Sequence, residues 1–237
     1  MAGRLILFPV PIGAEDLDFS LPRYNRELLV GCSIFIVEEL RTARRFLRKA
    51  GYSADFNDVD FHVLNEHTKE NEAVHYLDGI EEGKDVGLLS EAGLPCVADP
   101  GMMVVSMAQQ RGIEVVPLVG PSSILLSLMA SGLNGQTFAF VGYLPVDKAG
   151  RSDAIRRLER TAQKEGQTQI FIEAPYRNNQ MLETLCSVCR PDTMICVACD
   201  LTMPTQMVRT ATARQWGKMR LSVDLHKRNT VFLIGVK

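Results

Sequence analysis

The sequence lacks the features that mark a membrane or secreted protein. No apolar run in its 237 residues approaches the roughly 18 residues that a membrane-spanning helix needs. The apolar start, LILFPVPIGA, is interrupted by Pro9 and Pro11 and is followed by Glu15 and Asp16, unlike a signal peptide. We therefore expect a cytoplasmic protein with no membrane partner, whose six cysteines are free thiols.

The sequence also lacks the common motifs of nucleotide-binding and hydrolytic enzymes. It contains no GxGxxG, no GxxxxGK[ST], no GxSxG elbow and no HExxH. Its four histidines are scattered, and we expect them to be exposed. These absences exclude the commonest enzyme patterns, and we predict no metal site.

Four cysteines lie close together in CSVCRPDTMICVAC, residues 186–199, and raise the alternative of a zinc site. Zinc fingers and ribbons usually place roughly 12 to 20 residues between their ligand pairs, whereas only RPDTMI separates these pairs. The surrounding pattern predicts a helix from Met181, a turn at Pro191 and a buried strand from Met194. We interpret the four cysteines as small core residues.

The chain has little net charge, −2 at pH 7, so it offers no strongly basic footprint for nucleic acid. Any RNA contact has to come from a local patch. Two segments carry basic residues at helical spacing. They are Arg41, Arg44, Arg45, Arg48 and Lys49 in the first segment, and Arg151, Arg156, Arg157 and Arg160 in the second. Such a stripe is usually a solvated face, but beside a catalytic cleft it can hold a phosphate backbone.

Short aliphatic runs alternate with amphipathic patterns along the chain. In the first half, strands are predicted over 5–10, 33–37, 61–64, 86–89 and 115–118, and helices over 42–50, 72–82 and 102–111. In the second half, extended segments are predicted over 137–141, 169–173, 194–198, 206–211 and 230–236, and helices over 122–130, 151–164 and 178–189. We predict an α/β fold of two domains, 1–118 with a mainly parallel sheet and 119–237 with a mixed sheet.

Three loops rich in Gly and Pro each follow a predicted strand: PVPIGAED at 9–16, SEAGLPCVADPG at 90–101 and GPSS at 120–123. In an open parallel sheet, such loops share the edge where ligands bind. We expect Asp99 to be a helix N-cap, with Pro100 and Gly101 following it, and Ser122 to be another. Two such helix ends suit an anion. A single loop of this kind is more often an ordinary turn, but the three together predict a ligand cleft.

Several motifs, in order along nearly the whole chain, carry a family resemblance. They are PVPIG, SEAGLPCVADPG, VVPLVGPSS followed by MASGL, FVGYLP, and IEAPYR. Together they resemble the tetrapyrrole methylase superfamily of S-adenosylmethionine-dependent methyltransferases. The pattern is most similar to the branch that methylates a ribose 2'-hydroxyl in small-subunit ribosomal RNA. The resemblance implies two α/β domains with S-adenosylmethionine bound in a cleft between them, usually in a homodimer.

Carried over by position, the resemblance also implies which residues contact the cofactor. They are Pro11 and Gly13 in the first loop, Ala92, Gly93, Leu94 and Val97 in the second, Ser122 and Ser123 in the third, and Glu173, Ala174 and Leu201 from the second domain. These loops would hold a sulfonium nucleoside through backbone groups. Because the charge on sulfur disappears as the methyl group moves, tight electrostatic binding of the cation would slow the step.

The stretches next to the implied acceptor pocket depart from the RNA branch. Where that branch has Glu-Asp-Thr-Arg, Ser-Asp-Ala-Gly-Thr-Pro and Glu-Ser-Pro-His-Arg, this chain has EELR at 38–41, SEAGLP at 90–95 and EAPYR at 173–177. The Asn that usually follows the first Gly is Ala14. These departures affect the prediction of an RNA acceptor more than the prediction of the cofactor.

A hydroxyl acceptor must lose its proton, so a carboxylate near the methyl group is expected. The catalytic candidates are Glu38 and Glu39, with Arg41 beside them and Glu173 as a third acid. An adjacent pair in an extended segment points in opposite directions, so we expect one acid to face the cleft. The alternative is a solvated pair at the positive end of the next helix.

Three functions remain open from the sequence. The first, which we favour, is a methyltransferase for ribosomal RNA, with RNA affinity that falls steeply with salt. The second is a methyltransferase for a tetrapyrrole or another small molecule, with a wide, partly apolar cleft. The third is a non-catalytic relative that binds the cofactor or a partner without turnover.

Overall fold

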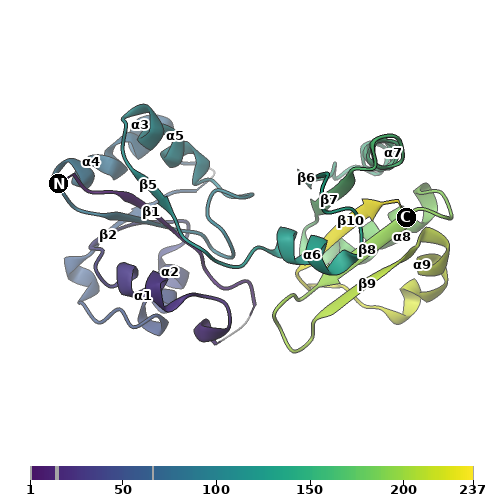
Figure 1. Ribbon diagram of the computed structural model, residues 1–237, viewed down its shortest axis with the longest axis horizontal. Coiled ribbons are helices and arrows are strands. Elements are labelled where there is room, and N and C mark those ends of the chain that lie inside the picture. The colour runs from purple at the N-terminus through teal and green to yellow at the C-terminus, as the bar shows by residue number, and fades with distance from the viewer. Residues whose placement is uncertain (1, 14–15, 66, 237) are drawn as a thin grey trace. The chain divides into compact units, whose positions relative to one another are not determined.

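The computed structural model describes residues 2–13, 16–65 and 67–236. The chain forms two compact units, Met1–Ser122 and Ser123–Lys237, and each has its own five-stranded sheet (Figure 1). The division falls between Ser122 and Ser123, a few residues beyond Leu118, where the sequence places the domain boundary. Val119 packs with the first unit because its carbonyl oxygen accepts a hydrogen bond from Asn25 Nδ2 at 2.8 Å.

The first unit alternates strands with helices around a wholly parallel sheet of order β3-β2-β4-β1-β5. Its strands are β1 (Leu5–Phe8), β2 (Ile34–Val37), β3 (Asp60–Val63), β4 (Val86–Leu89) and β5 (Val115–Pro117). Its helices are α1 (Arg23–Leu29), α2 (Leu40–Lys49), α3 (Glu70–Ala73), α4 (Asp78–Glu81) and α5 (Met102–Gln110). Three short 3-10 helices are η1 (Leu17–Phe19), η2 (Phe56–Asp58) and η3 (Val74–Leu77).

Helices cover both faces of this sheet, with α1 and α2 on one face and α3, α4 and α5 on the other (Figure 1). Central parallel strands are therefore buried on both sides and consist of continuous apolar runs. In β2 the side chains of Phe35 and Val37 enter the core under α1 and α2, whereas Ile34 and Ile36 enter the opposite core. This confirms the predicted α/β layer with a parallel sheet.

The second unit holds a mixed sheet of order β6-β7-β10-β8-β9, in which only β6 and β7 are parallel neighbours. Its strands are β6 (Phe138–Tyr143), β7 (Thr168–Ile172), β8 (Met194–Cys199), β9 (Met207–Thr212) and β10 (Thr230–Gly235). Its helices are α6 (Ser123–Ser131), α7 (Lys148–Glu165), α8 (Asn178–Val188) and α9 (Ala213–Met219), with the 3-10 helices η4 (Pro175–Arg177) and η5 (Arg220–Ser222). The mixed sheet was predicted.

The main core of the second unit lies between the sheet and α7, α8 and α9. The fully buried Trp216 packs there, and its indole N–H donates to the carbonyl oxygen of Ile195 at 2.9 Å. Cys189, Cys196 and Cys199 are buried apolar-type residues, and all six thiols of the chain are free, as the sequence predicts.

Three helical features differ from the prediction. The helix expected over 72–82 is broken into α3, η3 and α4. In the middle of this stretch, the Tyr76 hydroxyl donates to the carbonyl oxygen of Val63 at 2.9 Å and its ring stacks on His62. The sequence interpretation also missed α1, which has no side-chain cap, and α9, which begins with a Thr212–Gln215 capping box.

The three Gly/Pro loops of the first unit meet at one edge of its sheet, as predicted. Strands β4, β1 and β5 are neighbours, so their carboxyl ends lie side by side. Val10 and Gly93 pair through two backbone hydrogen bonds of 2.9 and 2.8 Å, which join the first loop to the second. Gly120 packs so closely on Pro9 that an added Cβ would lie 2.1 Å from the Pro9 Cβ. This close approach joins the third loop to the first.

Replacing Gly120 with Ala is expected to lower the free energy of unfolding by about 1–3 kcal/mol, because the rigid Pro9 ring cannot move aside for the new methyl group. Urea unfolding followed by circular dichroism measures the change. Gly31→Ala is the matched control in the same unit, since its Cβ would meet only a carbonyl oxygen at 3.4 Å. Equal midpoints for the two variants would contradict the close packing of the loops.

Candidate active site

The loop after β4 has an unusual backbone. Gly93 has φ +81°, and its buried position is fixed by the Val10 pairing and by the Ser90 hydroxyl, which donates to the Gly93 carbonyl oxygen at 2.8 Å. Cys96 and Ala98 also have positive φ, at 67° and 61°. Residues with a Cβ rarely adopt this conformation, which costs on the order of 1–2 kcal/mol per residue. The surrounding contacts must therefore hold the loop in place.

Strained backbone is concentrated at the same kind of edge in both units. Among the described residues, the non-glycine positions with positive φ are Cys96, Ala98, Asp200, Thr202 and Lys227. The first two follow β4. The next two follow β8, and the last precedes β10, which begins where β8 ends. Conformations of this kind cluster at binding and catalytic sites, so both edges are candidates.

Asp99 organises the second half of the loop after β4. Its Oδ1 accepts hydrogen bonds from the backbone N–H groups of Cys96 at 2.8 Å and Gly101 at 2.7 Å. Helix α5 begins at Met102 with Gly101 as its N-cap, so the predicted helix start at Asp99 is two residues too early. The carboxylate satisfies the turn before the helix, as an Asx turn does.

Glu38 lies at the end of β2, beside this turn. Its carboxyl group is hydrogen-bonded to the Asp99 carboxyl group and accepts from the backbone N–H of Glu91. Burial raises the pKa of Glu38 to about 7, and the negative charges of Asp99 and Glu91 add to the effect. The pKa of Asp99 is also raised, chiefly by burial. The contact between the two acids raises the pKa of Glu38 and lowers that of Asp99, so Glu38 is the member of the pair that holds a proton more readily.

Glu39 and Arg41 have different surroundings. The Glu39 carboxylate is the N-cap of α2 and accepts from the backbone N–H groups of Arg41 at 3.0 Å and Thr42 at 2.8 Å. These bonds lower the pKa of Glu39. Arg41 is exposed on the first turn of α2. As the sequence led us to expect, one acid of the adjacent pair faces the loop edge and the other caps the helix.

Thr42 connects α2 to the loop after β4. Its hydroxyl donates to Glu91 Oε1 at 2.7 Å, so the start of α2 and the loop hold each other in position. Together Glu38, Glu91 and Asp99 give the loop edge an acidic character. That character is compatible with a cationic ligand and does not favour the anion expected from two helix ends.

The second unit gathers its predicted residues at one edge as well. Strands β7 and β8 are both antiparallel to β10, which lies between them, so their carboxyl ends share an edge. Glu173 and Ala174 follow β7, and Leu201 follows β8 in a turn where Asp200 pairs with Arg228 at 2.7 Å.

Glu173 is fully buried and forms an ion pair with Arg177. Its Oε1 accepts from Arg177 Nη2 at 2.7 Å, from Arg177 Nε at 3.0 Å and from the Ala174 backbone N–H at 2.7 Å. Its Oε2 is buried without a hydrogen-bond partner among the described residues. A buried carboxylate oxygen of this kind is costly unless something donates to it, so it is a candidate ligand contact.

The remaining predicted cofactor contacts are distributed between the two units. Pro11 and Gly13 in the first loop are half-buried, Ala92 and Val97 are exposed, Leu94 is half-buried, and Ser122 is buried just before Ser123 starts α6. Ala14 and Glu15 lie outside the described residues. The first-unit residues thus share one loop edge.

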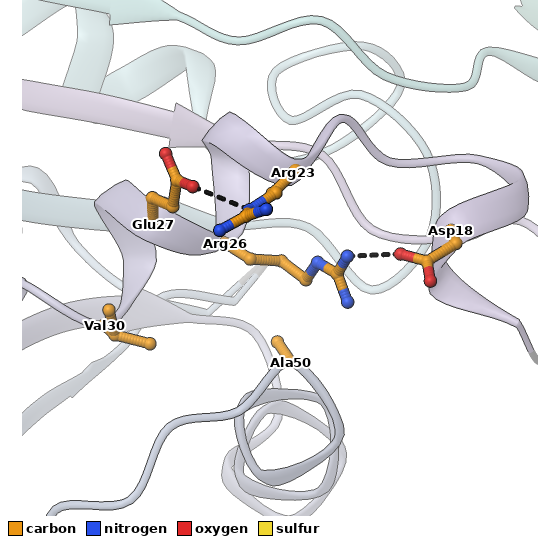
Figure 2. Close-up of a pocket in the computed structure, with 6 residues that line it drawn as sticks. All are labelled: Asp18, Arg23, Arg26, Glu27, Val30 and Ala50. Carbon is orange, nitrogen blue, oxygen red and sulfur yellow. Dashed lines mark hydrogen bonds and ion pairs between the residues drawn. The ribbon is translucent and has the colours of Figure 1, made fainter.

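The large depression in the first unit lies elsewhere. It has a volume of about 580 Å³ and is lined by Asp18, Arg23, Arg26, Glu27, Val30 and Ala50 (Figure 2). Figure 2 shows both arginines in ion pairs, Arg23 with Glu27 and Arg26 with Asp18. Because α2 runs back from the loop edge, its last turn next to Ala50 belongs to the opposite edge. This depression is therefore not the candidate active site.

The two basic stripes are smaller than the sequence suggests. In the first, the Arg44 and Arg48 guanidinium groups pack on the rings of Phe56 and Phe61, and Arg48 donates to two backbone carbonyl oxygens. In the second, Arg151 is buried, so the patch predicted there loses one of its four members. Exposed basic residues remain at Arg41, Arg45, Lys49, Arg156, Arg157 and Arg160.

Comparison with known proteins identifies the family. The family model of the Tetrapyrrole (Corrin/Porphyrin) Methylases matches residues 6–216. The chain belongs to this family. As a member of a family of methylases, it is a methyltransferase, and the expected α/β architecture of two units is the one observed. No helix among the described residues is long and apolar enough to span a membrane.

Two curated relatives of the chain carry the same name. The chain is 30% identical over 239 residues to the ribosomal RNA small subunit methyltransferase I of Escherichia coli O157:H7, covering 95% of this chain and 79% of that protein. It is 34% identical over 184 residues to the protein of the same name from Pseudomonas aeruginosa, covering 78% of this chain and 60% of that protein.

Solved structures give the same fold. The methyltransferase CobJ matches with a TM-score of 0.65 at 20% identity, over 99% of this chain and 95% of its own. The cobalt precorrin-4 methyltransferase CbiF matches with a TM-score of 0.60 at 16% identity, over 98% of this chain and 94% of its own. At these identities the likeness concerns the fold.

The sequence interpretation missed two features of the site. It interpreted Asp99 only as a helix cap, although an acid in a loop facing another acidic loop is a candidate for proton sharing. It also missed that Arg177 anchors on Glu173, although the spacing of four residues after a strand end was visible. Neither contact follows from local pattern alone, because each depends on how the loop folds back.

Replacing Glu38 with Gln is expected to stabilise the protein more at about pH 8 than at about pH 5. A carboxyl group whose pKa rises on folding, from 4.5 to about 7, binds its proton more tightly in the native state. The wild type therefore loses stability as the pH rises through that window, whereas the neutral Gln does not.

Urea unfolding at the two pH values measures this difference. Glu39→Gln is the control with the opposite sign, because folding lowers the pKa of Glu39 and the variant loses a favourable charge at the start of α2. A difference between Glu38→Gln and wild type that does not change with pH would argue against the raised pKa of Glu38.

Proposed function

We propose that the chain is an S-adenosylmethionine-dependent methyltransferase that methylates a ribose 2'-hydroxyl of small-subunit ribosomal RNA. The observation that carries the proposal is the Glu38–Asp99 carboxyl pair beside three converging loops, in a chain whose relatives bear the name ribosomal RNA small subunit methyltransferase I. The carboxyl pair supplies a base for the proton of the hydroxyl group that is methylated. The names of the relatives indicate the class of molecule that carries this hydroxyl group.

The loop edge fits S-adenosylmethionine chemically. The cofactor supplies a methyl group on a positively charged sulfur. The loops present backbone groups and small or apolar side chains at Pro11, Gly13, Ala92, Gly93 and Leu94. Their charged members, Glu15, Asp16, Glu91 and Asp99, are all acidic, so the loops contain no cation that would repel the sulfonium. We propose these residues, with Val97 and Ser122, as the cofactor contacts of the first unit, and Ser123, the first residue of the second unit, as a further contact.

In the second unit, we propose Glu173, Ala174 and Leu201 as cofactor contacts. Glu173 Oε2 is the buried acceptor without a partner, and a ligand hydroxyl or amino group satisfies it at no further desolvation cost. Leu201 lies in a turn between two residues of positive φ, Asp200 and Thr202, which expose backbone in a fixed direction.

In the proposed mechanism, Glu38 accepts the proton of the acceptor hydroxyl. A pKa of about 7 makes its carboxylate a stronger base than an ordinary Glu, yet leaves a large fraction ionised at neutral pH. Asp99 keeps Glu38 in place, since its own Oδ1 is fixed by two backbone N–H groups. Glu39 and Arg41 support the start of α2. The enzyme otherwise accelerates the reaction by holding the reacting atoms in line.

RNA binding is proposed to use Arg41, Arg45 and Lys49, the exposed basic residues of α2 that, within the described part of the chain, do not pack on an aromatic ring. Helix α2 follows the Glu38 strand directly. Phosphate contacts from Arg and Lys position an RNA without reading its sequence. An enzyme for ribosomal RNA works where ribosomes are made, so we propose a cytoplasmic location.

A homodimer is also proposed. Strand β6 is an edge of the second sheet, and it exposes Phe138, Val141 and Tyr143, with Val146 shortly after it. Exposed apolar edge strands are rare in monomers because they invite pairing with another chain. A second copy of the chain is the simplest partner to cover this surface.

The alternative acceptor is a tetrapyrrole, favoured by the family description and by the two solved structures of similar fold.

The decisive experiment incubates the protein with methyl-labelled S-adenosylmethionine and either small-subunit ribosomal RNA or a porphyrinogen extract. Label is expected in the RNA, on a ribose oxygen, and nuclease digestion followed by mass spectrometry locates it. Label in the extract alone would support the tetrapyrrole reading. Cofactor binding without any transfer would support a non-catalytic relative.

Methyl transfer is expected to increase with pH through about 7, because only ionised Glu38 accepts a proton. Glu38→Gln should slow transfer by about 10²–10⁴-fold, while calorimetry still detects cofactor binding.

Asp99→Asn removes a negative charge that raises the pKa of Glu38, so the midpoint of the pH profile should move to lower pH. Asn can still accept from Gly101 and Cys96, so the loop is kept.

Glu27→Gln, in the depression of Figure 2, is the control and should leave the pH profile unchanged. A midpoint that stays in place in Asp99→Asn would remove Asp99 from the mechanism. Full transfer by Glu38→Gln would remove Glu38.

A further inference from the structure

We propose that Tyr176, held by Arg177, is a stacking surface for a nucleobase of the acceptor RNA. The inference rests on the proposed function, which supplies RNA as the acceptor, and names a residue that contacts it. The two side chains lie on η4, directly after β7, at the edge of the second unit that carries Glu173 and Leu201.

Tyr176 is an exposed aromatic side chain in a fixed orientation. Its relative exposure is 62%. Arg177 Nη1 donates to the Tyr176 hydroxyl at 3.0 Å, and the guanidinium carbon lies 5.1 Å from the ring centroid, within the range of a cation–π contact. Two interactions with one residue therefore orient the ring.

Arg177 is itself anchored. Its Nε and Nη2 both donate to Glu173 Oε1, and the Glu173 side chain is fully buried. The chain of contacts runs from a buried carboxylate through a guanidinium to an exposed ring. Because the ring is already ordered, a ligand that stacks on it pays little conformational entropy.

The loop under the ring is fixed as well. The Lys227 backbone N–H donates to the carbonyl oxygen of Pro175 at 3.0 Å, which ties η4 to the segment before β10. Asn178, the first residue of α8, is buried and its Nδ2 donates to the carbonyl oxygen of Arg228 at 2.6 Å. Two hydrogen bonds to the segment before β10 therefore hold η4 and the start of α8 in place.

Other exposed aromatic residues lack this arrangement. Phe19, Tyr24, Phe138 and Tyr143 are also exposed, but among the described residues the arginine contacts with an exposed ring occur only at Tyr176. Exposed rings often mark a contact between subunits, and such a contact would explain the exposed rings of β6. It does not explain a ring held by a buried ion pair at the candidate site.

A nucleobase suits this platform better than other flat groups. Proteins that bind unpaired RNA stack bases on Tyr, Phe and Trp, and Arg adds attraction for the base and its phosphate. Sequence-specific RNA recognition targets mostly unpaired nucleotides, and an ordered aromatic ring can take the place of a neighbouring base in the stack of such a nucleotide.

Fluorescence anisotropy with a labelled single-stranded RNA of about 12 nucleotides tests the proposal. Tyr176→Ala is expected to weaken binding about 10-fold, and Tyr176→Phe about 2-fold or less, because the ring remains. The salt dependence of binding should not change, since no phosphate contact is removed. Tyr24→Ala, with a similarly exposed ring in the first unit, should bind as wild type does.

A second probe with abasic riboses in place of the bases separates stacking from phosphate contacts. Wild type and Tyr176→Ala should bind this probe equally. Equal binding of the normal RNA by wild type and Tyr176→Ala would overturn the inference and leave the proposed function intact. Failure of the wild type to bind any RNA would overturn both. Weaker binding of a porphyrin by Tyr176→Ala, with RNA binding unchanged, would assign the ring to a tetrapyrrole and overturn the nucleobase.

Discussion

The backbone pairing of Val10 with Gly93 is the contact on which the candidate site of the first unit depends. Parallel neighbours such as β1 and β4 normally diverge into separate connections after their last residue. Here the segments that follow β1 and β4 turn toward each other and exchange two backbone hydrogen bonds. The pairing requires positive φ at Gly93, and it fixes the start of a loop whose end carries Asp99. At the end of that path, Asp99 meets Glu38.

The same loop shows why strain and function coincide. Cys96 and Ala98 occupy left-handed conformations that glycine would adopt at no steric cost. The N–H of Cys96 points to Asp99 Oδ1, so the strained turn is also the one that holds the carboxylate. In the second unit, Asp200 and Thr202 flank Leu201 in the same way, and Asp200 is secured by Arg228. At one edge the hydrogen bonds to the Asp99 carboxylate, and at the other the Asp200–Arg228 ion pair, compensate for unfavourable backbone conformations.

Much of the fold was accessible from sequence because local signals and tertiary structure agree. The continuous apolar runs IFIV and VGLL predict buried parallel strands, and both are central in the sheet. The adjacency of the three loops followed from strand order in parallel sheets. What could not be predicted depends on how side chains fold back on the rest of the unit. The Tyr76 hydroxyl donates to the Val63 carbonyl oxygen where the expected helix is broken, and the buried Arg151 donates to the Val146 carbonyl oxygen. A basic residue at helical spacing gives no sign of which face will be covered.

The candidate acids were predicted as a set, but their roles had to come from geometry. Glu38 and Glu39 are indistinguishable in sequence, yet one caps a helix and the other is buried against a second acid. Gln at position 38 or Asn at position 99 would accept the same backbone hydrogen bonds without the repulsion between two carboxylates. Hydrogen bonding therefore does not explain why both groups are acids. A carboxyl pair offers what amides cannot, namely exchange of a proton near neutral pH. Retaining the destabilising acids is thus the expected outcome where proton transfer is the task.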